Sequence, residues 1–285
     1  MALHRTQALV VGRRALGESD RLVEFYTLAF GKLRGVARSA RRPRSRFGSA
    51  LEPFTFGELI FFDTGRSELV RVDHFDILQS FVALREDLVR LGYAASSVEC
   101  VLRLTGDRDA HPALFRLLVR TLRVIESSPR PAWVSACFAA RAVDLLGHRP
   151  RIDRCISCGR PAPFPQAALD VGAGGLVCAR CQPGPDAIVL SPGVLGTLTR
   201  IRELRWEDAM RLVLASRLEN EMVDVMEGMI ARLAGQIPRS ARFLAQMRRS
   251  PSRVAERHPV FAAPRGRAGG STREPSSYGS STPSG

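Results

Sequence analysis

Four cysteines arranged as two C-x-x-C pairs constrain this chain more than any other feature of its sequence. Cys155 and Cys158 form the first pair, and Cys178 and Cys181 form the second. Each pair offers two thiolates from one tight turn, and the segment between the pairs allows both turns to converge on one tetrahedral ion. Four sulfur ligands fill the coordination shell of a cation such as Zn²⁺ and leave no position for water or substrate. The spacing therefore predicts a structural zinc site.

Three other uses of these cysteines stay open: two disulfides, a thiol redox centre, or an iron–sulfur cluster. A redox motif normally begins a helix after a strand in a βαβ pattern, and no such pattern surrounds either pair. The first 14 residues carry no secretory signal and no apolar run approaches the 18 or so residues of a membrane span, so we expect a cytoplasmic protein with reduced thiols and no membrane contact. Cys100 and Cys137 lie in apolar, helix-like stretches and are expected to be buried.

Short apolar segments separated by turn residues predict five strands in the first 80 residues, with an OB barrel as one candidate fold. The expected strands are Gln7–Leu16, Arg21–Leu28, Lys32–Ala37, Thr55–Phe62 and Glu68–Phe75.

A helical pattern follows, because apolar residues recur at spacings of three and four. The expected helices cover Leu84–Leu104, Pro112–Ile125, Pro131–Leu146, a segment that begins after the N-cap Ser191, Leu212–Leu233 and Ala241–Met247. The cysteine segment, 149–185, interrupts this pattern and reads as an insertion that folds around its metal. Residues 248–285 are rich in Gly, Ser, Pro and Arg and predict a flexible basic tail.

Positive charge is concentrated near the N-terminus. The chain has 42 Lys and Arg against 28 Asp and Glu, a formal net charge of +14, and no acidic residue lies between Glu24 and Glu52. A cationic loop of this kind can follow a phosphate backbone, although a merely solvated charge run stays an alternative. The candidate nucleic-acid-binding residues are Lys32, Arg34, Arg38, Arg41, Arg42, Arg44 and Arg46. Arg13, Arg14 and Arg71 are weaker candidates.

Aromatic residues in the same region are expected to divide between the barrel interior and the surface. Alternation along the fourth strand predicts that Leu59 and Phe61 face outward. Phe47, inside the arginine-rich loop, is the best candidate for stacking on a base. The face assigned to the barrel interior contains Phe54, Phe56, Ile60 and Phe62.

No catalytic constellation is present in the sequence. The five histidines are scattered, and the chain has no P-loop, no H-E-x-x-H, no G-x-S-x-G and no dense acidic cluster. We therefore expect a binding protein and no enzymatic activity.

An ordered succession of motifs resembles the RecO family of bacterial recombination mediators, over roughly residues 4–247. The motifs are Gly17-Glu18-Ser19-Asp20, Gly31-Lys32-Leu33-Arg34-Gly35-Val36-Ala37-Arg38, Ala40-Arg41-Arg42-Pro43-Arg44-Ser45-Arg46, Leu51-Glu52-Pro53-Phe54, Leu84-Arg85-Glu86-Asp87 and Asp153-Arg154-Cys155-Ile156-Ser157-Cys158-Gly159.

The resemblance implies an α+β protein with an N-terminal five-stranded OB-fold barrel over residues 1–80 and a helical domain over 81–247 that carries the zinc finger. It also implies binding of single- and double-stranded DNA and annealing of complementary strands. The implied partners are RecR, the C-terminal tail of single-stranded DNA-binding protein and, indirectly, RecA, whose loading such proteins assist. Some family members lack the cysteine finger, which agrees with a structural role for zinc.

Two other functions stay open at this point. An RNA- or ribosome-associated assembly factor would also combine an OB barrel with a four-cysteine finger. A metal- or thiol-dependent enzyme would lose turnover, with folding intact, when one cysteine is replaced.

Overall fold

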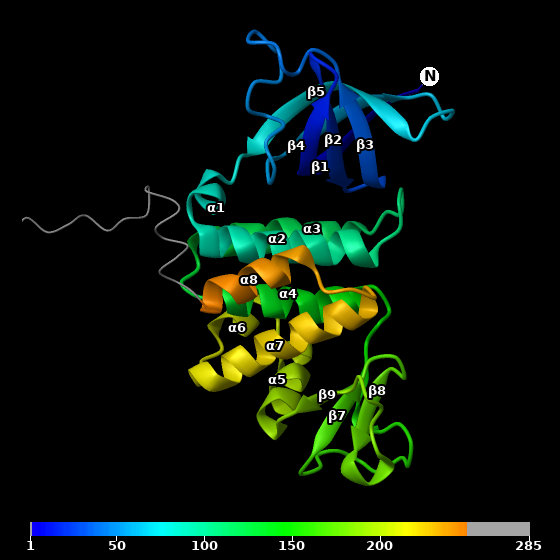
Figure 1. Cartoon of the computed structure of the whole chain (residues 1–285), viewed down its shortest axis with the longest axis vertical. Coiled ribbons are helices and arrows are strands. Elements are labelled where there is room, and N and C mark those ends of the chain that lie inside the picture. The colour runs from blue at the N-terminus through cyan, green and yellow to red at the C-terminus, as the bar shows by residue number, and fades with distance from the viewer. Residues whose placement is uncertain (1, 250–285) are drawn as a thin grey trace, which may run out of the picture. The chain divides into compact units, whose positions relative to one another are not determined.

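The N-terminal part of the chain folds into a closed five-stranded barrel. The structure is a computed structural model that describes residues 2–249. Its strands are β1 (Ala2–Leu16), β2 (Asp20–Thr27), β3 (Gly31–Ala37), β4 (Phe56–Asp63) and β5 (Leu69–Gln79). The strand order is β1-β2-β3-β5-β4, closed by pairing of β1 with β4, and β3 pairs with β5 in parallel (Figure 1). The predicted OB-type barrel is confirmed.

The face of β4 that lines the barrel is the opposite of the predicted one. Leu59 and Phe61 are fully buried in the barrel core. Phe54 and Phe56 instead belong to the core of the helical domain, and the Phe56 ring lies 6.2 Å from that of Phe115. The prediction of an inward Phe56 face and an outward Phe61 was therefore wrong.

Both faces of β4 are apolar because the strand contacts two cores, so alternation alone cannot tell the interior from the exterior. Glu58 has the same parity as Phe56 and forms an ion pair with Arg5 on the barrel surface. Because a charged side chain rarely faces a barrel interior, Glu58 was the sequence signal that the Phe56 face of β4 points outward from the barrel. At Gly57, on the inner face, a Cβ atom would lie 2.3 Å from the carbonyl oxygen of Asp76.

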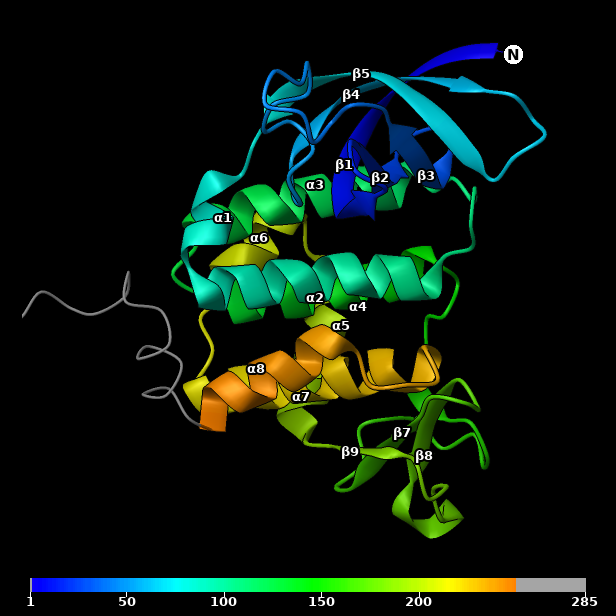
Figure 2. The ribbon, with the colours of Figure 1, turned by 45° about the horizontal axis from the view of Figure 1, so that its top comes forward.

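A layer of helices lies under the barrel (Figure 2). The first four are α1 (Val82–Glu86), α2 (Leu88–Leu104), α3 (Pro112–Ser127) and α4 (Pro131–Leu145). The single helix expected from Leu84 is divided at Asp87, whose carboxylate accepts hydrogen bonds from the backbone N–H groups of Val89 and Arg90 and so caps α2. Ten of the residues of α4 are buried, including Trp133 and Cys137, because neighbouring helices cover it on several sides.

The chain returns to helical structure after the cysteine segment. These helices are α5 (Pro192–Glu203), α6 (Trp206–Arg211), α7 (Ser216–Leu233) and α8 (Arg239–Arg249). Ser191 caps α5 as predicted, since its hydroxyl accepts a hydrogen bond from the Val194 N–H at 3.2 Å. The methionines of α7 are buried in the common core. Of the predicted tail, the first two residues end α8, and residues 250–285 lie outside the described part of the chain.

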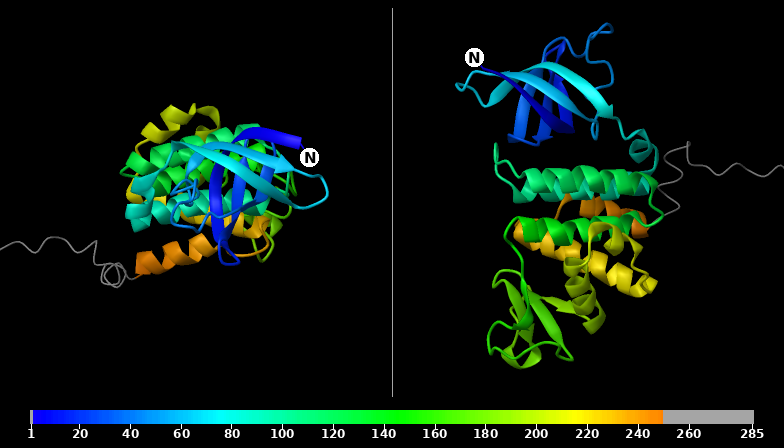
Figure 3. Two further views of the ribbon diagram at one scale, coloured as in Figure 1. Left: turned by 90° about the horizontal axis from the view of Figure 1, so that it is seen from above. Right: turned by 180° about the vertical axis from the view of Figure 1, so that it is seen from behind.

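The cysteine segment forms a small four-stranded sheet at the end of the helical layer opposite the barrel (Figure 3). Its strands are β6 (Arg151–Cys155), β7 (Ala167–Asp170), β8 (Gly175–Cys178) and β9 (Ile188–Leu190), in the order β6-β8-β7-β9. Leu169, Leu176 and Leu190 join the core cluster of the helices. The insertion therefore does not depend on its metal alone, since it shares an apolar core with α7 and its neighbours.

Among the helices of residues 2–249, none is both long enough and apolar enough to cross a lipid bilayer.

Candidate nucleic-acid interface and metal centre

The basic loop, defined here as residues 38–46, begins a connection of successive turns between β3 and β4. Backbone hydrogen bonds from Arg42 N–H to Ser39, from Ser45 N–H to Arg42 and from Gly48 N–H to Ser45 close these turns. Apolar side chains of the connection are inserted into the end of the barrel, where they join its core. They are Ala40, Phe47, Ala50 and Leu51. The loop thus closes the barrel, and its backbone is held in place.

Asp20 ties the start of the basic loop to the turn between β1 and β2. Its Oδ1 accepts hydrogen bonds from the Ser39 N–H at 2.8 Å and from the Ser19 hydroxyl at 3.0 Å. These bonds, first of all the one from Ser39, hold the pKa of Asp20 below its usual value. The Arg41 N–H also donates to the carbonyl oxygen of Ser19 at 2.9 Å. The Gly17–Asp20 motif is therefore a support for the loop.

The arginines of the basic loop all point to solvent. Within residues 2–249, none of the five forms an ion pair with a carboxylate. Arg41 donates to the carbonyl oxygen of Gly17 at 2.6 Å, and the Arg46 guanidinium lies 5.0 Å from the ring centroid of Phe47. Clustered guanidinium groups that form no ion pair, on an ordered backbone, can take up phosphate oxygens at little conformational cost. The exposed set is Arg38, Arg41, Arg42, Arg44 and Arg46.

Phe47 is 3% exposed and cannot offer its ring face to a base, so its prediction as a stacking residue was wrong. The ring belongs to the barrel core, because the loop needs an apolar side chain there to close the barrel. The guanidinium of its neighbour Arg46 lies over the ring.

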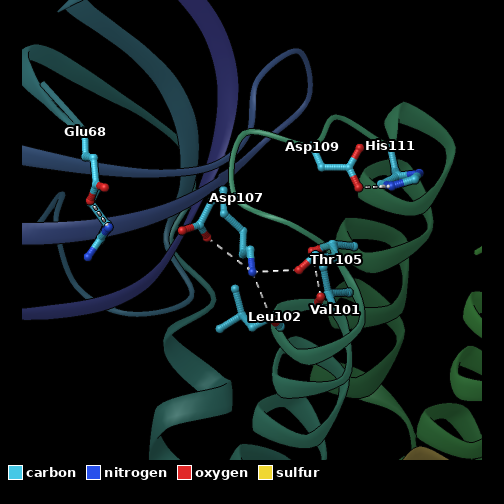
Figure 4. A network of polar contacts seen from close by, with 9 residues as sticks. Glu68, Val101, Leu102, Thr105, Asp107, Asp109 and His111 are labelled. Carbon is cyan, nitrogen blue, oxygen red and sulfur yellow. Dashed lines mark hydrogen bonds and ion pairs between the residues drawn. The ribbon is translucent and has the colours of Figure 1, made fainter. Parts of the chain in front are cut away.

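Lys32, the first predicted DNA-binding residue, lies between the barrel and the helices. Its ammonium donates to the carbonyl oxygens of Thr105 at 2.7 Å and Leu102 at 3.0 Å, and it lies 3.4 Å from a carboxylate oxygen of Asp107. Figure 4 shows these three residues converging at the end of α2. An ammonium at a helix C-terminus satisfies carbonyl groups that have no partner inside the helix. Three internal oxygen partners leave Lys32 little to offer a phosphate.

The contact between β3 and the segment after α2 is continuous with the Lys32 network. Gly31 has a φ of +60°, and a Cβ atom there would lie 2.2 Å from the carbonyl oxygen of Asp109. The Arg108 N–H donates to the carbonyl oxygen of Lys32 at 3.1 Å, and its guanidinium donates to Asp63 at 2.6 Å. Only glycine permits so close a backbone approach. Figure 4 shows Asp109 beside His111, its hydrogen-bond partner.

Arg34 lies on the outer face of β3 and is partly engaged. Its guanidinium forms an ion pair of 2.7 Å with Glu68, which follows the turn between β4 and β5. Both side chains are exposed, so this pair is weak and can exchange its carboxylate for a phosphate. Arg34 therefore stays with the basic loop as a candidate contact.

The four cysteines of the two C-x-x-C pairs converge at one point. Their sulfur atoms all lie within 4.8 Å of one another. The Sγ of Cys178 is 3.8 Å from that of Cys158 and 3.7 Å from that of Cys181. Four sulfurs at about 2.3 Å from a central tetrahedral ion are separated by about 3.8 Å, so the arrangement fits a Zn²⁺-sized cation. The cluster can hold a metal ion.

Backbone N–H groups around this cluster favour thiolates. The Cys178 N–H donates to the Sγ of Cys155 at 3.4 Å, and with the N–H groups of Cys158 and Ser157 it lowers the pKa of Cys155 to about 6. Hydrogen bonding among the thiols, first with Cys158, raises the pKa of Cys181 to about 12. Opposite shifts within one cluster mean that all four sulfurs ionise together only when a cation compensates their charge.

A hollow of about 420 Å³ lies between α3, α4 and α5, away from both sites. Its lining combines Leu117 and Leu145 with a single acid, Asp144. Burial lowers the pKa of Arg141, which donates to the carbonyl oxygen of Leu204 at 2.6 Å. A basic hollow with apolar walls suits an acidic peptide that carries an apolar side chain. The lining arginines are Arg116, Arg120, Arg141 and Arg202, of which Arg120 pairs with Glu207 and Arg202 with Asp144.

Comparison with known proteins decides the family. The model of the N-terminal domain of recombination protein O matches residues 1–81, and the model of its C-terminal domain matches residues 85–242. This chain belongs to the RecO family.

Relatives named DNA repair protein RecO agree with this membership along most of the chain. The protein of Anaeromyxobacter sp. (strain K) is 35% identical over 233 residues, which are 81% of this chain and 91% of the relative. That of Syntrophobacter fumaroxidans is 33% identical over 257 residues, 88% of this chain and all of the relative. That of Geobacter metallireducens is 37% identical over 193 residues, 65% and 78% of the two chains. The RecO resemblance drawn from sequence motifs is confirmed.

Some residues of this RecO-family chain that line a site had no sequence signal. The arginines of the hollow come from three helices and more than 80 positions of sequence, so no local pattern marks them. The basic loop was found because its arginines lie close together in the sequence.

Proposed function

We propose that this protein is a DNA-binding recombination mediator that binds single- and double-stranded DNA, anneals complementary strands and has no catalytic activity. The observation that carries the proposal is the ordered basic loop, whose five exposed arginines form no ion pair with a carboxylate within residues 2–249. Phosphate neutralisation by such groups is independent of sequence and depends strongly on salt.

Annealing by this surface needs no bond chemistry. Two strands repel each other because each carries dense negative charge, and a cationic surface that neutralises both raises their rate of encounter. Base pairing then provides the driving force. Because Lys32 is engaged within the protein, the proposed surface consists of Arg34 and the arginines of the basic loop.

For protein partners, we propose RecR, single-stranded DNA-binding protein through its C-terminal tail and, indirectly, RecA, which the complex helps to load on coated DNA. RecO-family membership supports these assignments, and the basic hollow between α3, α4 and α5 is the candidate site for the tail. Such a protein would act in the bacterial cytoplasm and associate with the nucleoid when bound to DNA.

For the metal, we propose structural Zn²⁺ bound by Cys155, Cys158, Cys178 and Cys181. The tetrahedral fit of the sulfurs and the N–H groups directed at Cys155 support this choice. The ion would join two turns of the small sheet and hold it on the helices.

Annealing of complementary oligonucleotides precoated with single-stranded DNA-binding protein tests the function. We expect the unmodified chain to accelerate annealing and the triple variant Arg38→Ala, Arg42→Ala, Arg44→Ala to lose most of that effect. The matched control is Arg200→Ala, Arg205→Ala, Arg211→Ala, which removes the same charge from exposed positions of the helical domain. Equal losses in both variants would refute the assigned surface. Competition with structured RNA of equal length, if it displaced DNA, would favour an RNA-binding role instead.

A separate experiment tests the tail site. Arg116 is exposed at the mouth of the hollow, and we expect Arg116→Glu to weaken binding of the tail peptide about tenfold or more while binding of bare DNA is unchanged. Unaltered peptide binding would place the tail elsewhere.

A further inference from the structure

A row of outward-facing residues crosses the barrel on the side of β3, β5 and β4. The strand register places Val36 opposite Arg71, Arg71 opposite Phe62, and Phe62 opposite Leu3 of β1. Directly opposite residues share one face of a sheet, so these four side chains lie side by side outside the barrel. Leu3 is 60% exposed, which leaves the end of the row open to solvent.

Phe62 and Arg71 form a cation–π pair at the centre of this row. The guanidinium carbon of Arg71 lies 4.3 Å from the centroid of the Phe62 ring. Arg71 is exposed and forms no ion pair with any carboxylate in the described residues, while Phe62 is half-buried. The guanidinium of Arg71 therefore lies over an aromatic ring and is also exposed to solvent.

The pair is next to the cationic surface. Arg34 and Val36 both lie on the outer face of β3, because they are two residues apart. Arg38 follows at the start of the basic loop. The acids near the adjoining turn are already paired, Glu68 with Arg34 and Asp63 with Arg108. A strand whose phosphates follow the arginines from position 34 to the loop would have its bases beside Arg71.

We propose that the Phe62–Arg71 pair is a stacking site for one unpaired nucleobase, which lies on the free face of the Arg71 guanidinium. This inference rests on the proposed DNA-binding function and adds to it a contact that is specific for single strands. Guanidinium planes and aromatic rings stack on bases whatever the base, because every base has a π face. Phe62 fixes the orientation of the guanidinium before binding, so that less conformational freedom is lost on stacking.

The basic loop and the Phe62–Arg71 pair then differ in whether they distinguish single strands from duplexes. The basic loop contacts phosphates, which single strands and duplexes both present. The Phe62–Arg71 pair requires a base that is free of its partner, so it favours single strands and releases the base when annealing pairs it. The surface thereby prefers the substrate of annealing over its product.

The test compares Arg71→Lys with Arg66→Lys. The first keeps the charge and removes the planar group from the cation–π pair, and the second makes the same change at an exposed arginine in the adjoining turn. We expect Arg71→Lys to weaken binding of an unstructured single strand about fivefold to tenfold and to leave duplex binding and the salt dependence unchanged. Arg66→Lys is expected to change neither.

A second variant and a spectroscopic signal distinguish loss of base stacking from a general loss of DNA binding. Phe62→Leu, checked for an unchanged melting temperature, is expected to reproduce the loss. In the unmodified protein, a 2-aminopurine scanned along a single strand of defined register is expected to show a stacking signal at one position, and Arg71→Lys is expected to abolish it. Unaltered single-strand affinity in Arg71→Lys, or equal losses for single strands and duplexes, would overturn the stacking site while the DNA-binding function stands. If the unmodified protein binds no DNA, the proposed function itself fails.

Discussion

The ammonium nitrogen of Lys32 lies 2.7 Å from the carbonyl oxygen of Thr105, so a side chain of the barrel caps the C-terminal end of α2. The same nitrogen reaches the carbonyl oxygen of Leu102 and the carboxylate of Asp107. In the sequence, Lys32 begins a run of basic residues that were all predicted to bind DNA. In the folded protein, Lys32 instead joins the barrel to the helices.

Replacement of Lys32 by Met is therefore expected to affect stability more than DNA binding. The change leaves two carbonyl groups of α2 without their charged donor and should lower the free energy of unfolding by about 2 kcal/mol. Single-strand affinity should change less than twofold and the salt dependence should stay the same, as measured by urea unfolding and fluorescence anisotropy. The matched variant Arg42→Met should show the reverse pattern. A large loss of affinity with unchanged stability in Lys32→Met would return this residue to the DNA surface.

Removal of Arg38, Arg42 and Arg44 should reduce the salt dependence of binding. For a single strand, the slope of log affinity against log salt falls by about 0.7 for each phosphate that the protein no longer neutralises. The triple Ala variant should thus lower the slope by up to about 2 and weaken binding to the same degree for all sequences. Titrations at several salt concentrations measure this, and a slope equal to that of the unmodified protein would contradict it.

The support of the loop by Asp20 should depend on pH. Hydrogen bonds from Ser39 and Ser19 lower its pKa in the folded protein, so the stabilisation is present above the pKa of the unfolded chain and is lost as pH falls through the lowered folded value. We expect Asp20→Asn to be less stable than the unmodified protein near neutral pH, and the difference to vanish in acid. Unfolding curves from about pH 7 to about pH 3 measure it, with Glu18→Gln, at an exposed neighbouring position, as the control. A difference that persists in acid would argue against this role.

Loss of one thiolate should loosen the small sheet and leave the barrel intact. We expect Cys155→Ser to lose bound metal and to become sensitive to trypsin at the exposed Arg154, Arg160 and Arg180. Single-strand binding by the barrel should persist. Cys100→Ala, at a buried cysteine outside the cluster, should keep its metal. Native mass spectrometry and timed proteolysis provide the readouts; metal retained by Cys155→Ser at full occupancy would exclude that residue as a ligand.

Several features of this protein follow from its sequence alone. The two C-x-x-C pairs predict their own convergence, because each pair is a local turn and only one closure remains to be made. The basic loop is likewise local, as its arginines lie close together and carry no acids among them. The five strands and the principal helices follow from alternation, periodicity and caps such as Ser191, which act within a few residues.

Tertiary structure decided what each of these residues faces. Apart from Glu58, the fourth strand is apolar on both sides, and its contacts with Phe115 and with the barrel core show that Phe56 points to the helices and Phe61 to the interior. Lys32 and Arg38 have the same kind of charge in sequence, but one meets the end of a helix and the other meets water. The burial of a side chain and its polar partners depend on segments distant in sequence that pack together. A local sequence pattern therefore does not predict them.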